Sequence, residues 1–263
     1  MINNIRLFVN NNKESIDKSL ALKEKLISNG FNVVDNDDFE LAIAIGGDGA
    51  FLRTVKANNF NSNIYYVGIN TGHLGFLQDI NPDDVDKFIE ELIDKKYRIE
   101  KIGIQETKVV YDHKEENFYS LNEIVIRDAN LDLLCAKAYI DDEFLEKYVG
   151  DGLMIATSIG STAYNLSYNG SIVYPSFATL QLTSMAPINS IRYRSLINSI
   201  IIPDKKIIKI VPDNENMLIS IDGINKPFDD VKQVESTIDK KHIKCLRFTH
   251  YSFPKKINEK LLS

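Results

Sequence analysis

The stretch LAIAIGGDG, residues 41–49, decides the fold of this chain. It begins with an unbroken apolar run, which predicts a strand buried on both faces, as in a parallel sheet covered by helices. Glycines and one aspartate follow at 46–49, and a helix is predicted over 50–58. Ligands bind at the carboxyl ends of strands in open α/β sheets, so this turn is the first candidate site.

The segments on either side of this stretch alternate between strand and helix. A helix with apolar residues at helical spacing precedes it and is ended by a glycine. A second helix, opened by Asn-Pro-Asp-Asp, follows it, because asparagine caps a helix and proline suits its first turn. The predicted order is strand 5–9, helix 13–29, Gly30, strand 31–34, strand 41–45, helix 50–58, strand 64–69 and helix 81–95. This alternation predicts a parallel α/β layer structure up to about residue 100.

Beyond residue 100 the pattern changes to short β-rich runs separated by turn residues. The predicted strands are 108–111, 121–126, 134–140, 153–157, 200–202, 207–211 and 218–221. No linker rich in Gly, Ser or Pro separates the halves, and no internal repeat is evident. We therefore expect two domains, the second mostly β-sheet, with a change of periodicity as their boundary.

Composition and charge exclude several classes of protein. The chain has 263 residues, 44% of them hydrophobic and 26% charged, which is typical of a globular protein. A net charge of -6 and scattered Lys and Arg residues argue against a nucleic-acid partner, since phosphate neutralisation needs a basic surface. Cys135 and Cys245 lack the spacing of a zinc site. No apolar run approaches the ~18 residues that span a bilayer, so we expect no membrane partner and a cytoplasmic location.

The turn Gly46-Gly47-Asp48-Gly49 offers a phosphate site and a carboxylate together. Backbone N–H groups of Gly46, Gly47 and Gly49 approach phosphate oxygens without hindrance from a Cβ atom. Asp48 is placed to accept a proton or to orient a cation. Arg53, one turn into the next helix, either steadies a phosphate or lies on a solvated helix face. The alternative interpretation is a tight turn, because glycine and aspartate are common turn residues, and neither the Rossmann nor the Walker motif is present here.

The glycine-rich stretch 68–77 follows a strand and is predicted to be a loop over the candidate site. Phe76 and Leu77 offer an apolar wall to a flat base; the alternative is a loop that plugs the core. Further along, Asn122 and Glu123 interrupt an apolar strand. They are either an exposed strand end or a donor and an acceptor for ribose hydroxyls and base edges.

A third block lies around residues 151–167. Asp151 precedes an apolar strand, and Ser161 or Thr162 is predicted to cap a helix. The amino end of that helix attracts phosphate or polar base edges, and Tyr164 stacks on an aromatic ring. The alternative is a capped helix with a core tyrosine.

Together these blocks carry a resemblance to a known family. The turn 46–49 is similar to a signature shared by NAD kinases, diacylglycerol-type lipid kinases and phosphofructokinases. Residues 68–77, GINTGHLGFL, closely resemble the G-x-N-x-G-x-L-G-F-L stretch of NAD kinases, and 121–123 and 151–167 agree in the same order. The chain thus resembles bacterial NAD kinases from Gly46 to Ser167. Two later segments, 185–187 and 220–223, are weaker matches, and the histidine or glutamine that many relatives carry after Asp222 is absent.

The resemblance implies an architecture. An amino-terminal α/β (Rossmann-like) domain with a parallel sheet is expected over residues 1–100, joined by a carboxyl-terminal segment, 237–263, whose helical part lies near 255–262. A β-rich, NAD-binding β-sandwich domain is expected over 101–236. Self-association as a homotetramer or homodimer is also expected from the family.

The resemblance also implies an activity. The γ-phosphoryl group of ATP is transferred to the 2′-hydroxyl of the adenosine ribose of NAD, giving NADP, with Asp48 as general base and Mg²⁺ arriving with the ATP. Besides the glycines, Arg53, Phe76 and Leu77, the expected nucleotide-binding residues are Asn122, Glu123, Asp151, Ser161, Thr162, Ala163, Tyr164, Asn165, Leu166, Ser167 and Ala186. No protein-bound metal is expected.

Two other functions stay open at this stage. A lipid or sugar-phosphate kinase shares the Gly-Gly-Asp-Gly turn, and a non-catalytic regulator binds NAD without making NADP. The sequence also leaves open whether polyphosphate replaces ATP, whether NADH is accepted and whether NADP inhibits.

Overall fold

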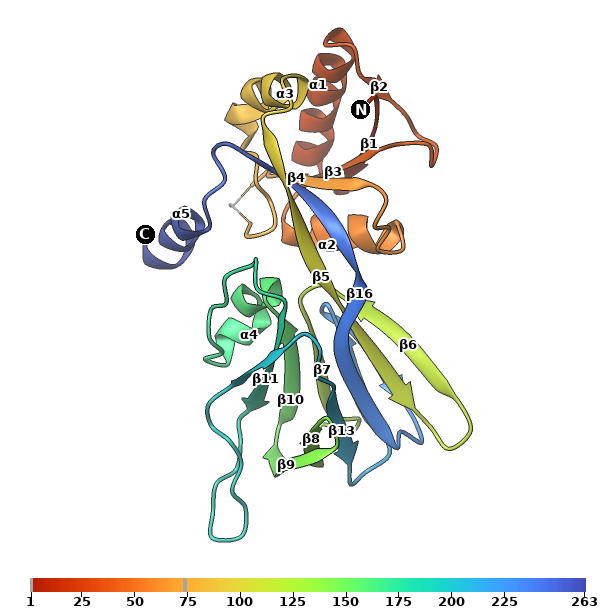
Figure 1. Ribbon diagram of the computed structural model, residues 1–263, viewed down its shortest axis with the longest axis vertical. Coiled ribbons are helices and arrows are strands. Elements are labelled where there is room, and N and C mark those ends of the chain that lie inside the picture. The colour runs from red at the N-terminus through yellow and green to blue at the C-terminus, as the bar shows by residue number, and fades with distance from the viewer. Residues whose placement is uncertain (1, 73–74) are drawn as a thin grey trace. The chain divides into compact units, whose positions relative to one another are not determined.

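The computed structural model describes residues 2–72 and 75–263 of the chain (Figure 1). His73 and Leu74, which belong to the glycine-rich stretch 68–77, lie outside the described residues. None of the helices in the described part is long and apolar enough to cross a membrane.

The chain divides into two compact units. The first consists of Met1–Ile102 and His242–Ser263, and the second of Gly103–Lys241. The chain passes between the units within two long strands, β5 (Tyr97–Val110) and β16 (Gln233–Phe248).

The first unit is built on a parallel sheet with the strand order β2-β1-β3-β4-β16. Besides the end of β16, its strands are β1 (Asn4–Val9), β2 (Asn32–Val33), β3 (Leu41–Ile45) and β4 (Tyr65–Ile69). Every residue of β3 is buried, as its unbroken apolar run predicts.

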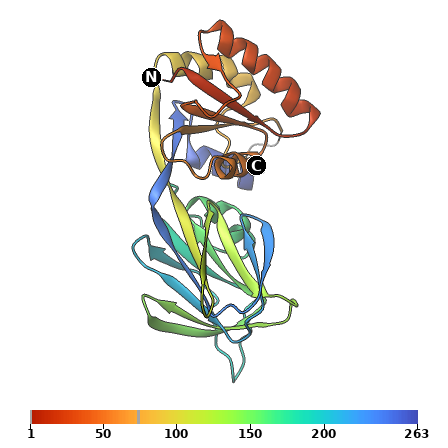
Figure 2. The same ribbon diagram turned by 90° about the vertical axis from the view of Figure 1, so that its right-hand side faces the viewer.

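Helices cover both faces of this sheet, with α1 and α3 on one face and α2 on the other (Figures 1 and 2). On the first face Ile43 packs in one buried cluster with Leu26 of α1 and Phe88 of α3. On the second face the ring of Phe51 in α2 lies 6.4 Å from that of Tyr66. The helical segments of the unit are α1 (Lys13–Ser28), α2 (Asp48–Ala57), η1 (Pro82–Asp84), α3 (Val85–Ile93), α5 (Phe253–Ile257) and η3 (Asn258–Leu262).

Two helix starts differ from the prediction. Helix α2 begins at Asp48, ahead of the expected Ala50, because Gly47 is its N-cap and Gly47 O accepts the Ala50 N–H at 2.8 Å. Asp48 therefore lies in the first turn, at the positive end of the helix dipole. Asn81 precedes a 3₁₀ turn, and its side chain donates to Asp84 Oδ2 at 3.2 Å instead of capping the backbone.

The second unit is a β-sandwich. One sheet is antiparallel, with the order β12-β11-β10-β7-β14-β15; the other face is formed by β16-β13-β8-β9, and β5 pairs with β16 and β6. Its remaining elements are β6 (Glu115–Ser120), β7 (Glu123–Asp128), β8 (Leu134–Ile140), β9 (Glu143–Gly150), β10 (Gly152–Thr157), η2 (Ile159–Thr162), α4 (Tyr164–Ser167), β11 (Thr179–Met185), β12 (Ile200–Pro203), β13 (Ile208–Pro212), β14 (Met217–Ile221) and β15 (Ile224–Phe228).

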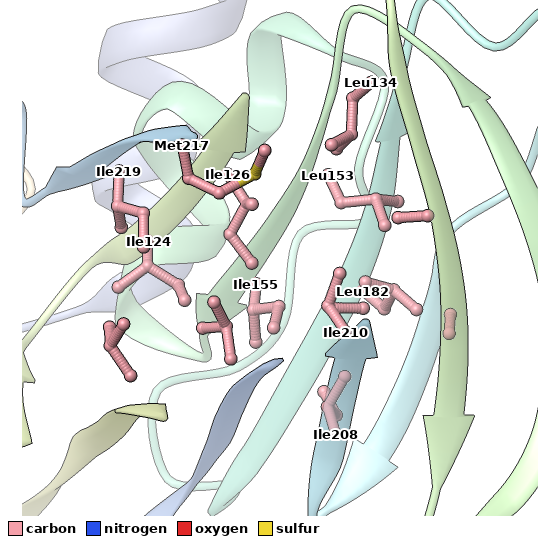
Figure 3. Packing of buried hydrophobic residues seen from close by; sticks show 14 of the residues in the cluster. Ile124, Ile126, Leu134, Leu153, Ile155, Leu182, Ile208, Ile210, Met217 and Ile219 are labelled. Atoms are coloured by element: carbon pink, nitrogen blue, oxygen red, sulfur yellow. The ribbon is translucent and has the colours of Figure 1, made fainter. Parts of the chain in front are cut away.

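The core of the sandwich is formed by alternate residues of facing strands (Figure 3). Ile124 and Ile126 of β7 and Ile155 of β10 pack in one buried cluster with Ile208 and Ile210 of β13. The predicted fold class, a parallel α/β part followed by a β-sandwich, is confirmed.

Candidate functional site

The turn between β3 and α2 brings the Gly-Gly-Asp-Gly segment to the carboxyl end of the sheet, as predicted. Gly46 is buried with φ 147°, and a Cβ atom there would lie 2.8 Å from the Cβ of Ala50 and 3.0 Å from that of Asn10. Gly47 and Gly49 are exposed. The turn therefore needs glycine at 46 for its geometry and presents the backbone of 47 and 49 to solvent.

The carboxylate of Asp48 is held by the backbone of the glycine-rich loop. Its Oδ2 accepts the Phe76 N–H and its Oδ1 accepts the Leu77 N–H, both at 2.9 Å. A Cβ atom on Gly75 would lie 1.9 Å from Asp48 Oδ1, so only glycine allows this approach. Each carboxylate oxygen keeps acceptor capacity beyond the one N–H that it receives.

A second set of contacts joins the loop to the turn. Gln78 Nε2 donates to Gly47 O at 2.7 Å. The side chain of Gln78 lies over Gly68, where a Cβ atom would come within 2.0 Å of Gln78 Oε1. Gly68 and Gly75 thus allow close packing between loop, strand and turn.

The two apolar residues of this loop differ in exposure. Leu77 is buried, so its contribution here is the N–H that binds Asp48. Phe76 is half-buried, and its ring lies 6.4 Å from that of Phe253 and 4.5 Å from Lys260 Nζ. Burial lowers the pKa of Lys260, and the charge of Asp48 opposes that effect.

The carboxyl-terminal segment supplies residues that the sequence reasoning did not find. Lys256 of α5 is buried and binds the backbone carbonyls of Phe76 and Gln78. It also binds the carboxylate of Asp79, which is paired with Arg247 as well. No local motif marks these residues, because Lys256 follows Gln78 by well over a hundred positions in the sequence.

Arg53 lies on the exposed face of α2 and contacts the end of β1. Its Nη2 donates to Asn10 Oδ1 at 2.8 Å, at the end of β1. Arg53 is therefore tied to the strand next to β3, on the same edge of the sheet as Asp48.

In the second unit, Asn122 and Glu123 lie at the start of β7 and are buried, with 8% and 6% of their surfaces exposed. The interpretation as an exposed strand end is therefore wrong. Asp222, in the turn between β14 and β15, accepts the N–H groups of Leu121 and Asn122 at 2.9 and 2.7 Å. This contact fixes the backbone of the polar pair.

Burial of Asn122 and Glu123 leaves two of their side-chain oxygens without partners in the described part of the chain and shifts the pKa of Glu123. Among the described residues, Asn122 Oδ1 and Glu123 Oε2 are buried without a hydrogen-bond partner. Burial, followed by the charge of Asp222, raises the pKa of the Glu123 carboxyl to about 8, and the Tyr164 N–H acts in the opposite direction. Buried polar atoms normally find partners, so these two are available to a ligand.

The block 159–167 departs from the predicted capped helix. It forms a 3₁₀ turn, η2, followed by the single turn α4, and neither has a side-chain cap. Ser161 Oγ instead accepts the Val173 N–H at 3.0 Å, and Thr162 Oγ1 donates to Ile159 O at 3.2 Å. The predicted capping by Ser161 or Thr162 is wrong, because their hydroxyls are used within the fold.

The other residues of this block differ in how far they are exposed. Asn165 is buried and binds Gln181 and Thr183 of β11, at 2.8 and 2.6 Å. Tyr164 is 39% exposed, so it is not a core tyrosine, and its hydroxyl accepts from Arg127 Nη2 at 2.9 Å. Ala163 and Leu166 are half-buried, and Ser167 is exposed.

Asp151 and Ala186 lie side by side. The Asp151 N–H donates to Met185 O at 3.0 Å, and both Asp151 and Ala186 are exposed. Ala186 has φ 45°, a left-handed conformation that is uncommon for a residue with a side chain. In the second unit, Asp151 and Ala186 thus lie at the opposite end of β10 from Glu123, which pairs with Ala156.

The fold and the candidate residues together indicate a nucleotide-dependent phosphotransferase, and comparison with known proteins gives the family. Residues 6–97 match the model of the ATP-NAD kinase N-terminal domain, and residues 121–244 match that of the ATP-NAD kinase C-terminal domain. The chain belongs to the NAD kinase family.

Individual relatives agree with this membership. An NAD kinase from Finegoldia magna is 39% identical over 98% of this chain and 97% of its own length. NAD kinase 2 from Bacillus licheniformis is 34% identical, with 98% of each chain covered.

Solved structures of the same fold are also similar. The crystal structure of yeast NADH kinase complexed with NADH superimposes with a TM-score of 0.87 at 22% identity, covering 99% of this chain and 87% of that one. The NAD kinase from Archaeoglobus fulgidus in complex with ATP gives 0.79 at 19% identity, with 98% of each chain covered.

The Glu123 carboxyl predicts a pH-dependent stability of the second unit. Its pKa rises from the ordinary 4.5 to about 8 in the folded state, so its contribution to stability is fully present below about 4.5 and is lost progressively as the pH rises through about 8. One pKa unit corresponds to about 1.4 kcal/mol, so the loss is on the order of a few kcal/mol. Glu123→Gln stays neutral and should match the wild type near pH 5 but exceed its thermal midpoint near pH 9.

Glu24→Gln, the same chemical change on the exposed side of α1, serves as the control for this measurement. Parallel pH profiles for the wild type and Glu123→Gln would contradict the raised pKa.

Proposed function

We propose that this chain transfers the γ-phosphoryl group of ATP to the 2′-hydroxyl of the adenosine ribose of NAD. The attacking ribose oxygen forms a bond to the γ-phosphorus, and the bond from that phosphorus to the β-phosphate oxygen breaks. ADP leaves, NADP forms, and the hydroxyl proton passes to Asp48. The observation that carries the proposal is the Asp48 carboxylate, oriented by two N–H groups at the carboxyl end of β3.

The geometry around Asp48 supports a role in positioning and proton transfer. Phosphoryl transfer asks a protein chiefly to align the reacting groups and to neutralise charge. We assign the exposed backbone of Gly47 and Gly49 to the donor phosphates. Arg53 and the half-buried Lys260 are two cations near the same turn.

We assign dinucleotide binding to the β-rich domain, residues 101–236. The unpartnered Asn122 Oδ1 and Glu123 Oε2 would accept from, or donate to, ribose hydroxyls and base edges. Tyr164 offers an exposed ring for stacking. Residues with supporting roles at this site would be Asp151, Ser161, Thr162, Ala163, Asn165, Leu166, Ser167 and Ala186. In the α/β domain, we assign Phe76 and Leu77 of the glycine-rich loop to nucleotide binding as well.

The divalent cation enters with the nucleotide in this proposal. In the described part of the chain no three His, Cys, Asp or Glu side chains gather as a protein-held metal site would require. We therefore treat MgATP as the substrate, in which Mg²⁺ neutralises phosphate charge. From the resemblance to the family alone we also propose that the chain works in the cytoplasm as a homotetramer or homodimer.

Incubation with NAD and MgATP should yield NADP, detected by coupling to an NADP-specific dehydrogenase. Polyphosphate and NADH, tested in place of ATP and NAD, define the donor and acceptor range. Binding of NAD without any NADP, from either donor, would identify a non-catalytic regulator. Preferred transfer of labelled phosphate to diacylglycerol or a sugar phosphate would identify the other kinase classes that share the turn.

Asp48→Asn should leave NAD binding nearly intact and lower turnover by at least ~100-fold, the effect typical of losing a general base. The asparagine keeps an acceptor for one loop N–H but cannot take up the proton. Calorimetric NAD affinity and steady-state kcat are the two measurements. Unchanged turnover in this variant removes Asp48 from the mechanism.

Gly75→Ala should reduce turnover by about 10-fold or more, because the new methyl group meets Asp48 Oδ1 at 1.9 Å and displaces the carboxylate. Gly72→Ala is the matched control in the same stretch, since a Cβ atom there has nothing within 4 Å. The ratio of the two kcat values tests whether orientation of Asp48 matters. Equal rates would show that the carboxylate tolerates displacement.

A further inference from the structure

Lys256 lies in α5, near the carboxyl end of the chain, and is buried, with 6% of its surface exposed. Its ammonium donates to Phe76 O at 2.9 Å, to Gln78 O at 2.8 Å and to the Asp79 carboxylate. An ammonium group has three donors, and here each has an acceptor. The side chain is therefore fully committed to one short segment of the chain, 76–79.

The charge of Lys256 belongs to a buried cluster. Asp79 also pairs with Arg247, whose Nε donates to Glu100 at 2.6 Å. Burial lowers the pKa of Lys256, and Asp79 opposes this effect. Buried ion pairs contribute little net stability compared with apolar residues, so stability alone does not account for placing a lysine here.

The segment that Lys256 holds is the one that orients Asp48. Phe76 accepts from Lys256 through its carbonyl and donates to Asp48 Oδ2 through its N–H. Leu77, whose N–H binds Asp48 Oδ1, lies between the two carbonyls that Lys256 anchors. The ring of Phe253, one turn before Lys256, also packs against Phe76.

We infer that Lys256 is a positioning residue for the phosphoryl transfer. Its ammonium fixes the carbonyls of Phe76 and Gln78 and thereby aims the two N–H groups that orient Asp48. The inference rests on the proposed function, in which Asp48 is the general base. Lys256 thus acts on the reaction through the loop that it holds.

Lys256→Met removes the ammonium while keeping a side chain of similar length. Without the three hydrogen bonds the loop relaxes, and a carboxylate misplaced by about 1 Å lowers kcat by about 10- to 100-fold. The KM for NAD should stay within about twofold, because the residues assigned to the dinucleotide lie largely in another domain. Lys255→Met is the matched control, since Lys255 is exposed and its nearest acid is Glu259 at 3.6 Å.

A double-mutant cycle separates positioning from a general structural role. If Lys256 acts through Asp48, adding Lys256→Met to Asp48→Asn should lower the residual turnover by less than about threefold. A merely structural lysine would lower turnover by the same factor in both backgrounds, and that result overturns the inference. Wild-type kcat in Lys256→Met overturns it as well.

Two further measurements keep the test decisive. If Lys256→Met does not fold, Asp79→Asn combined with Lys256→Met removes one buried charge of each sign and leaves Arg247 paired with Glu100. In the folded variant, the amide hydrogens of Phe76 and Leu77 should exchange faster than in the wild type while those of β3 stay protected. Full turnover in Asp48→Asn refutes the proposed role of Asp48 as general base. If Asp48→Asn loses turnover but the Lys256 variants keep normal turnover and normal amide exchange, only the positioning role of Lys256 is refuted.

Discussion

Two backbone N–H groups converge on the carboxylate of Asp48, and much of the first unit serves to keep them there. Hydrogen bonds to a charged group contribute about 1.5–3 kcal/mol each, and the pair also fixes the direction in which the carboxylate points. The arrangement requires a chain path that a Cβ atom would block at Gly75 and at Gly68. Asp48 itself is set in place because α2 begins at that residue, with Gly47 as its N-cap.

Buried ion pairs and hydrogen bonds also stabilise the loop that orients Asp48. Lys256, Arg247, Asp79 and Glu100 form a buried set in which positive and negative groups are equal in number. Removing water from such groups is costly unless each finds a partner, and here each does. The result is a rigid support under a loop that glycine would otherwise leave mobile.

In the second unit, by contrast, some buried polar atoms lack hydrogen-bond partners within the part of the chain that the structure describes. Its sandwich core is apolar and closely packed, yet Asn122 Oδ1 and Glu123 Oε2 are buried at its end without partners among the described residues. Asp222 holds the backbone of this pair, and burial together with the charge of Asp222 raises the pKa of the Glu123 carboxyl. Unsatisfied buried polar atoms are costly, and we propose that a ligand supplies the missing hydrogen bonds here.

The sequence by itself determined the fold class and the main elements of the first unit. The apolar run 41–45 and the helical spacing of 13–29 are local signals, and the structure confirms both. Strand β11 is missing from the prediction because Gln181 and Thr183 interrupt its apolar pattern. Both side chains are buried within the sheet, where Asn165 supplies hydrogen-bond partners for them.

Only the tertiary structure decided how the candidate residues are used. The motif predicted Asp48 as a candidate residue, and its catalytic role stays a prediction. The N–H groups that orient its carboxylate come from residues 76 and 77, which the motif does not include. The sequence predicted that the hydroxyl of Ser161 or Thr162 caps a helix. In the folded chain these hydroxyls form hydrogen bonds with Val173 and Ile159 instead. No sequence motif predicts a role for Lys256. Local patterns determine periodicity and turns because those depend on neighbouring residues, whereas the direction of a carboxylate or the protonation of Glu123 depends on groups that only folding brings within reach.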